Sequence, residues 1–192
     1  MAAGVAVTPA TVWLTALGVT AQLGATVQDA NGEGMPGAAV TWTSSDPDVA
    51  TVSATGLVTA VGNGTAIITA TSGGVSGTAT VTVAQQAAVV AVSPEATTLT
   101  ALGATAPLAA TVRDAGGSVM VGAAIAWASS NTDVATVSAA GVVTAVGNGT
   151  ATITATSGGV SGTATVTVAI PPSTLTVLIM AGQGNNKAIN LG

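Results

Sequence analysis

The chain contains no cysteine, no histidine, no tyrosine and no phenylalanine among its 192 residues. The absence of cysteine excludes disulfides and metal sites built on thiolates, although it does not fix the compartment. A hydrolase or transferase needs a nucleophile with a base, a carboxylate pair or a metal. Because histidine and cysteine supply most of those arrangements, we expect that the chain is not an enzyme.

Charge is equally scarce, since 5% of the residues are charged, against roughly 25% in an ordinary globular protein. The basic side chains are Arg113 and Lys187, beside seven acidic ones. Nucleic acid is excluded as a partner, because phosphate is bound by clustered Lys and Arg. A surface of Thr, Ser, Ala and Gly lacks the repulsion that keeps proteins apart. It indicates either codon-biased drift or a surface that meets copies of the same chain.

Long hydrophobic runs are also missing, although apolar residue types make up 48% of the chain. A membrane-spanning helix needs ~20 mostly apolar residues in succession, and here Thr, Ser, Gly or Pro interrupts every run within a few residues. We therefore expect no membrane span. Residues 1–4 show neither the basic nor the apolar segment of a signal peptide. We expect an extracellular or cell-surface protein whose export signal is not visible here, or a virion protein.

What the chain does have is an internal repeat. Residues 5–84 align with residues 90–169 without a gap, at a constant offset of 85. Trp42 falls on Trp127, and from Asp48 to Ala84 only three positions differ between the copies. Such self-similarity indicates a recent duplication of one structural unit.

Each copy shows the period-two alternation that is typical of half-buried strands. Residues 65–71 place their even-numbered side chains, all apolar, on one face, and residues 78–83 alternate Thr with Ala or Val. Ile67 of the first copy is replaced by Thr152 in the second, a change on the Thr face, as expected if that face is solvated. The other predicted inward residues are Leu23, Ala25, Val27, Val40 and Trp42.

Turn signals separate these segments, and no segment has helical periodicity. They are Asn31-Gly32, Asp46-Pro47, Gly62-Asn63-Gly64 and Ser72-Gly73-Gly74. About seven short strands in about 80 residues, with one Trp on a central strand, predict an immunoglobulin-like sandwich. We predict an all-β fold of two tandem sandwiches plus an extra C-terminal strand, with Trp42 and Trp127 in the cores. The predicted domains are residues 1–86, residues 87–170 and a tail over residues 171–192, with a linker at residues 85–89.

Three runs in each copy carry a family resemblance. In the first copy they are Val40–Val52 (VTWTSSDPDVATV), Gly56–Val61 (GLVTAV) and Gly64–Ala70 (GTAIITA). The second copy matches them at residues 125–137, 141–146 and 149–155, and the opening runs Val5–Pro9 and Val90–Pro94 also fit. The chain resembles the bacterial immunoglobulin-like domain of group 2, known from intimin- and invasin-type adhesins, over about 160 of its 192 residues.

The resemblance implies a structural role. Such modules are mostly spacers or stalks in surface proteins, adhesins and polysaccharide-degrading enzymes, and they also decorate phage virions. Some members bind host matrix proteins or calcium. The family has no catalytic residues to carry over, and a shared fold is only an analogy for function.

Two acidic groups are candidate sites. Asp46 and Asp48 flank Pro47, and an Asp before Pro favours a turn, which we prefer to a catalytic pair because the second copy has Asn131-Thr132-Asp133. The loop Asp29, Asn31 and Glu33 offers oxygen ligands for calcium. Its counterpart Asp114, Gly116 and Ser118 keeps one acid. We therefore expect no cofactor, calcium being the remaining candidate.

The tail is not explained by the repeat. Its segment 174–181 begins where a third module's first strand would begin, and Thr174, Leu175, Thr176, Val177, Leu178, Ile179 and Met180 form the candidate assembly strand. It is either part of a longer array or following domain, or a strand donated to the sheet edge of the next subunit. Residues 177–185 also resemble the nucleophile block of acetylesterases in the Gly-Asp-Ser-type group, but Gly184 occupies the nucleophile's position. At most this is a remnant of such a fusion.

We expect a non-catalytic structural protein, either an extracellular stalk or a filament subunit that polymerises with copies of itself through a donated strand. A head-to-tail contact of that kind need not close and so gives an open filament. The alternatives are an adhesin-type module for a host protein or glycan, and a decoration or tail module of a phage virion. The sequence does not name a ligand.

Overall fold

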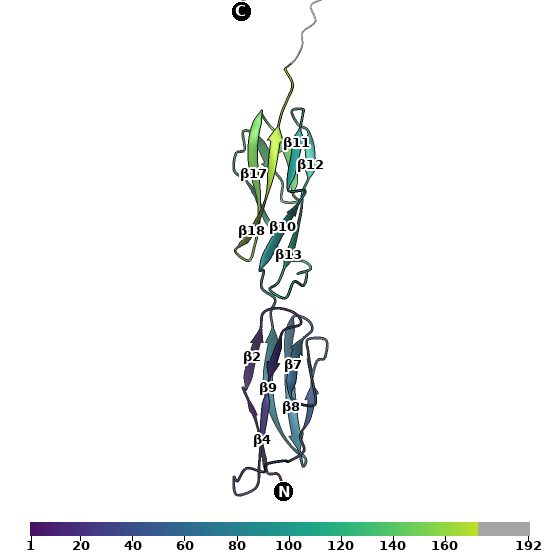
Figure 1. Cartoon of the computed structure of the whole chain (residues 1–192), viewed down its shortest axis with the longest axis vertical. Coiled ribbons are helices and arrows are strands. Elements are labelled where there is room, and N and C mark those ends of the chain that lie inside the picture. The colour runs from purple at the N-terminus through teal and green to yellow at the C-terminus, as the bar shows by residue number, and fades with distance from the viewer. Residues whose placement is uncertain (173–192) are drawn as a thin grey trace, which may run out of the picture.

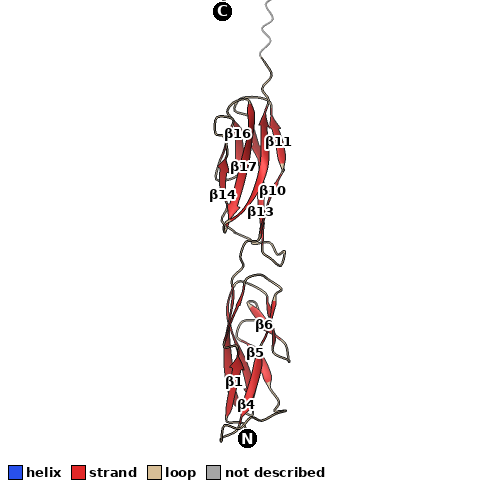
Figure 2. Cartoon of the chain, turned by 60° about the vertical axis from the view of Figure 1, so that its left-hand side comes forward, coloured by secondary structure: helices blue, strands red, loops and turns tan. Residues whose placement is uncertain are grey.

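The computed structural model describes residues 1–172 and shows two β-sandwich modules placed end to end (Figure 1). We call residues 1–86 module one and residues 87–170 module two. The predicted assembly strand Thr174–Met180 lies outside the described residues. Within residues 1–172 the regular elements are strands (Figure 2), and none of these residues belongs to a helix long and apolar enough to span a membrane.

Module one contains nine strands in three sheets. The strands are β1 (Gly4–Thr8), β2 (Thr11–Leu14), β3 (Thr20–Gln22), β4 (Gly24–Gln28), β5 (Thr41–Ser44), β6 (Ala50–Val52), β7 (Leu57–Ala60), β8 (Gly64–Ser72) and β9 (Val75–Val83). The largest sheet has the order β2-β9-β8-β5, in which β2 runs parallel to β9 and the other pairs are antiparallel. The sheet β3-β7-β6 and the pair β1-β4 complete the module.

Module two repeats this topology. Its strands are β10 (Val89–Ser93), β11 (Ala96–Leu99), β12 (Thr105–Pro107), β13 (Ala109–Arg113), β14 (Ala126–Ser129), β15 (Ala135–Val137), β16 (Val142–Ala145), β17 (Gly149–Ser157) and β18 (Val160–Val168). The sheets are β11-β18-β17-β14, β12-β16-β15 and β10-β13. The predicted all-β fold with two tandem sandwiches is thus confirmed.

The strand count differs from the seven expected because two strands are divided. The first strand pairs with β4 up to Thr8 and then, after Pro9, changes sheet to run beside β9 as β2. The next is interrupted at Leu23, which separates β3 from β4 and is 1% exposed. A single alternating segment can therefore contribute strands to two different sheets, and its periodicity alone does not reveal the division.

The alternation along the long hairpin places the core as predicted. Ala66, Ile68 and Ala70 of β8 are fully buried, while Ile67 between them is 47% exposed. The Thr side of that hairpin faces solvent in both modules. Each module has its own apolar cluster between its sheets, so each sandwich has a separate core.

Candidate functional site

The acidic pair of module one belongs to a turn. The backbone N–H of Asp48 donates to Oδ1 of Asp46 at 3.1 Å. In module two the N–H of Asp133 donates to Oδ1 of Asn131 at 3.0 Å. Because an amide replaces the carboxylate without changing this bond, the position needs an oxygen acceptor and not an acid, which agrees with the turn interpretation.

The acidic loop at the outer end of module one is organised by Asp29. Its Oδ1 accepts hydrogen bonds from the N–H groups of Asn31 at 2.9 Å and Glu33 at 3.0 Å, and these two bonds lower the pKa of the Asp29 carboxyl. In residues 1–172 no three Asp, Glu, His or Cys side chains lie close enough together to hold a metal ion. Oδ1 of this carboxylate is thus already committed to the backbone of its own loop.

The predicted core tryptophans lie at the edge of the cores. Trp42 and Trp127 are half-buried and pack against the apolar clusters of their modules. The Trp42 ring lies over Gly56, where an added Cβ would come within 2.9 Å of the ring. The third tryptophan, Trp13 on β2, has no role predicted from the sequence and is 71% exposed.

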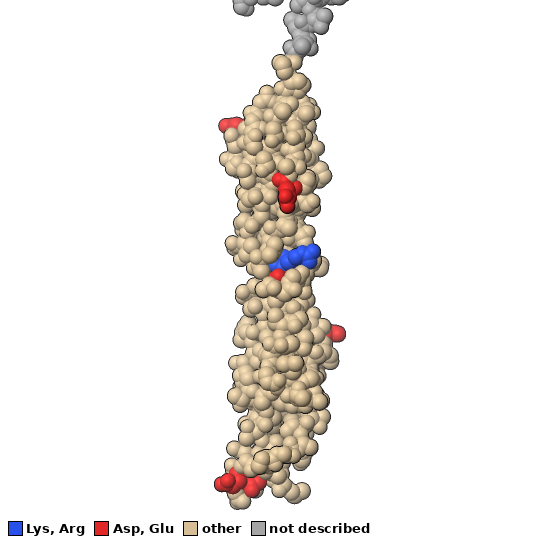
Figure 3. All heavy atoms as spheres, in the orientation of Figure 1, with Lys and Arg blue, Asp and Glu red and all other residues tan. Residues whose placement is uncertain are grey.

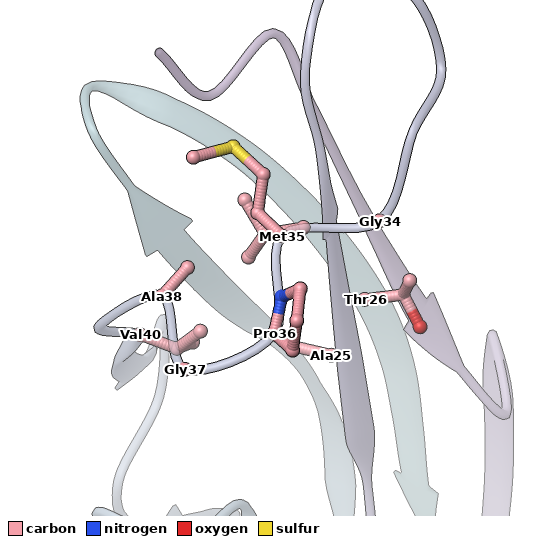
Figure 4. Close-up of a pocket in the computed structure, with 9 residues that line it drawn as sticks. Ala25, Thr26, Gly34, Met35, Pro36, Gly37, Ala38 and Val40 are labelled. Carbon is pink, nitrogen blue, oxygen red and sulfur yellow. The ribbon is translucent and has the colours of Figure 1, made fainter.

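Module one has an open depression of about 310 Å³ beside β4 (Figure 4). Small apolar side chains and backbone line it, with no charged group: Ala25, Thr26, Val27, Gly34, Met35, Pro36, Gly37, Ala38 and Val40. Small-molecule sites usually combine enclosure with a few convergent polar groups. This hollow lacks such groups.

The surface likewise carries few charged side chains. In the space-filling view the charged side chains form a few spots on an otherwise uncharged rod (Figure 3). Acidic atoms gather at the lower end of the rod, the outer end of module one, and the other acidic groups on this face lie apart from one another (Figure 3). The junction between the two modules is different, because a charged side chain is buried there.

Asp114 lies at this junction and is 2% exposed. It sits on the turn after β13, and its Oδ1 accepts the N–H of Ser118 at 2.9 Å within module two. Its Oδ2 accepts the N–H of Leu17 in module one at 2.9 Å and the side-chain Nε2–H of Gln85 in the linker at 2.8 Å. One carboxylate thus joins module one, the linker and module two.

Gln85 extends this network back into module one. Its Oε1 accepts from Nδ2 of Asn63 at 3.0 Å, and its backbone N–H donates to Oδ1 of Asn63 at 2.8 Å. The linker is therefore held against the Gly62-Asn63-Gly64 turn and aims its amide at Asp114. We call Leu17, Gln85, Asp114 and Gly116 the Asp114 joint.

Burial raises the pKa of the Asp114 carboxyl, but the hydrogen bonds outweigh this effect and the net pKa is lowered. The amide of Gln85 contributes most to the lowering, followed by the backbone N–H groups of Leu17 and Ser118. A carboxylate that accepts several hydrogen bonds is stabilised in its charged form. The ionised form of Asp114 is therefore the one that holds the joint.

Sequence reasoning does not find this network. It identifies Asp114 and Gly116 as a degraded calcium loop and Gln85 as linker. The available signal lies in two of the positions at which the copies differ near their ends: Asn31 stands against Gly116, and Gln85 against Ile170.

Among curated proteins, the chain is 37% identical over 133 residues to "Ice-binding protein 1" of Shewanella frigidimarina, a match that covers 68% of this chain and 15% of that protein. The chain thus spans a small part of that relative's length. Among solved structures, it is similar to domains 1–6 of the surface layer protein SbsC, with 24% identity, TM-score 0.43, and coverage of 90% of this chain and 28% of that one.

It is also similar to invasin, described as a bacterial integrin-binding protein, with 20% identity and a TM-score of 0.48, over 88% of this chain and 40% of that one. The family model of the bacterial Ig-like domain, group 2, matches residues 1–83 and again residues 86–168. Nearly the whole described chain is thus covered by two successive matches, and the chain belongs to the group 2 bacterial Ig-like domain family.

Proposed function

We propose that this chain is a non-catalytic spacer of a bacterial surface or extracellular protein, which holds the parts attached to its two ends a fixed distance apart. The observation that carries the proposal is the course of the chain (Figure 1). The chain enters at one end of module one and leaves at the opposite end of module two, so it spans the full length of the rod. The Asp114 joint connects the two modules at the middle.

Three other features support a spacer. Each module has its own core, so a module can be added or removed without opening its neighbour. The surface carries little charge, and the depression beside β4 lacks convergent polar groups. The surface location rests on the resemblance to modules of adhesins, and it belongs to the proposal.

Negative-stain electron microscopy and sedimentation of the full-length protein test this function. A spacer gives dispersed two-module particles with the mass of one chain. Filaments would contradict the spacer and favour a self-assembling subunit. A chain shortened after residue 172 would then show whether the predicted strand 174–180 makes the filament contact.

A second candidate function, contact with ice, is favoured by the outer face of module two. On β17 and β18, Thr150 pairs with Thr167, Thr152 with Thr165, and Thr154 with Thr163. Strand geometry spaces such side chains about 4.8 Å apart across the sheet and about 6.7 Å apart along a strand. A regular array of hydroxyl and methyl groups can match the regular spacing of water molecules at an ice surface, and the 37% identical relative is named an ice-binding protein.

Inhibition of ice recrystallisation by the full-length protein tests this candidate. We expect inhibition by the wild type and its loss in Thr152→Lys and Thr165→Lys, which place a charge in the lattice. Thr136→Lys, at an exposed position on β15 of the other sheet, is the matched control. A wild-type protein without effect on ice growth would reject this function and leave the spacer proposal intact.

A further inference from the structure

We propose that the Asp114 joint is a lock that fixes the two modules at one relative orientation and that accepts only a module end with aspartate at position 114 and glycine at position 116 or their equivalents. The inference deepens the proposed function, since it specifies which module end fits the joint. The conclusion that this joint keeps a spacer rigid rests on that proposed function.

The equivalent ends of the two modules differ in what covers them. Asp29 occupies in module one the place of Asp114, with the same bonds inside its own turn. At the other end, Leu102 corresponds to Leu17 and is 65% exposed, and Ala101 corresponds to Ala16, which is 1% exposed at the joint. The same two surfaces are therefore covered at the joint and open at the ends of the rod.

Gly116 comes very close to the backbone of module one. A Cβ built at this position would lie 2.7 Å from the carbonyl oxygen of Leu17, closer than real Cβ atoms come to backbone. The backbone of Gly116 is not in the left-handed region, unlike that of the neighbouring Gly117. Glycine is thus required at 116 by the contact with module one and not by the shape of the turn.

Module one shows that the turn itself accepts a side chain, because Asn31 stands at the equivalent position. By the same geometry, the Cβ of Asn31 would collide with a Leu17-like carbonyl. The outer end of module one therefore cannot make this lock with the far end of a second copy. Copies of the chain therefore cannot stack head to tail through this joint. The lock thus discriminates between module ends that share the same fold.

The linker residue Gln85 has no counterpart of the same kind in module two. Gln85 bonds Asn63 on one side and Asp114 on the other. In module two the equivalent of Asn63 is Asn148, but Ile170 occupies the place of Gln85 and has no side-chain amide. Glutamine is therefore present at the end that forms the joint, and isoleucine stands at the equivalent place of module two.

Electron-spin distance measurements on the full-length protein test the lock. The chain has no native cysteine, so nitroxide labels can be attached through Thr43→Cys and Ala128→Cys, two exposed and equivalent positions on β5 and β14. We expect one narrow distance peak for this labelled parent. Gly116→Asn and Gln85→Ile, which install the residues that the other copy carries, should each lose that narrow peak and give a broad distribution.

Asn31→Gly is the matched control, and it should keep the narrow peak because it lies away from the joint. A broad distribution in the parent, or a narrow and unshifted peak in Gly116→Asn, would overturn the lock. If Gly116→Asn does not fold by circular dichroism, the glycine is needed by the turn and the steric argument is wrong. Gln85→Ile then decides whether the hydrogen-bonded joint holds the modules.

The lock and the spacer can fail separately. A monomeric two-module particle with a broad distance distribution contradicts the lock and leaves the spacer. A narrow distribution within a filament contradicts the monomeric spacer and leaves the lock.

Discussion

At the residue scale, the central feature is a carboxylate that is held in the ionised state by three hydrogen bonds from three parts of the chain. Taking an ion out of water is costly unless its hydrogen bonds are replaced. Asp114 meets that requirement through Leu17, Gln85 and Ser118. Its equivalent Asp29 lacks the first two of these partners and is more exposed. The same residue type therefore has two roles, set by its neighbours.

The joint should weaken in acid. Asp114 has a folded-state pKa below its ordinary value of 3.8. A depressed folded pKa means that the stabilisation is complete above the ordinary value and is lost as the pH falls through the folded pKa. We expect the spin-label distance peak to stay narrow at neutral pH and to broaden only below 3.8. Asp114→Asn should remove this transition, and a peak that broadens between neutral pH and 3.8 would contradict the assignment.

Gly56 should be intolerant of any side chain. Its φ is +80°, and an added Cβ would lie 2.6 Å from the carbonyl oxygen of Leu23 and 2.9 Å from the Trp42 ring. Gly32 has a nearly identical φ of +81° but open space around it. We expect Gly32→Ala to cost about 1 kcal/mol, from the backbone conformation alone. Gly56→Ala should cost about 1–3 kcal/mol more through overpacking, as measured by urea unfolding. Equal losses would contradict the close contact.

At the element scale, the strand faces could be predicted from the sequence, while the division of strands between sheets could not. The hairpin β8-β9 has a strict alternation, and a period of two determines which side chains face inward. The break at Leu23 and the sheet change after Pro9 keep an apolar alternation on both sides, so the pattern does not reveal them. The positions of the tryptophans were predicted only partly, because ring burial depends on how the two sheets meet at their edge.

Neighbouring isoleucines of β8 should differ sharply in their sensitivity to threonine. Ile67 is 47% exposed and is already replaced by Thr152 in module two, so Ile67→Thr should change the free energy of unfolding by less than about 0.5 kcal/mol. Ile68 is fully buried. Ile68→Thr loses apolar volume and buries a hydroxyl, which should cost about 2 kcal/mol or more. A comparable loss at both positions in urea unfolding would contradict the assigned faces.

The tryptophans give a second pair of contrasting substitutions. Trp42 is half-buried against the core of module one, so Trp42→Ala should cost about 3 kcal/mol, the lower end of the range for a core Trp. Trp13 is 71% exposed on the same module, and Trp13→Ala should stay within about 0.5 kcal/mol. Denaturant titration followed by far-UV circular dichroism measures both. A loss at Trp13 as large as that at Trp42 would contradict the exposed placement of the Trp13 ring.

At the scale of the whole molecule, the repeat could be read from the sequence, but the joint could not. The offset of 85 identifies equivalent positions without showing which module ends meet. The contact depends on a handful of positions, and two of these differ between the copies: Asn31 stands against Gly116 and Gln85 against Ile170. In a tandem repeat, differences between nearly identical copies thus point to the surfaces that one copy uses and the other does not.

The central claim is that one chain forms an extended rod of two modules, and small-angle X-ray scattering of the full-length protein in dilute solution tests it most directly. The account predicts the forward scattering of a single chain and a pair-distance function with the long tail of two sandwiches end to end, unchanged in Asn31→Gly. A compact profile with the modules side by side, or a mass of several chains at every dilution, would contradict it.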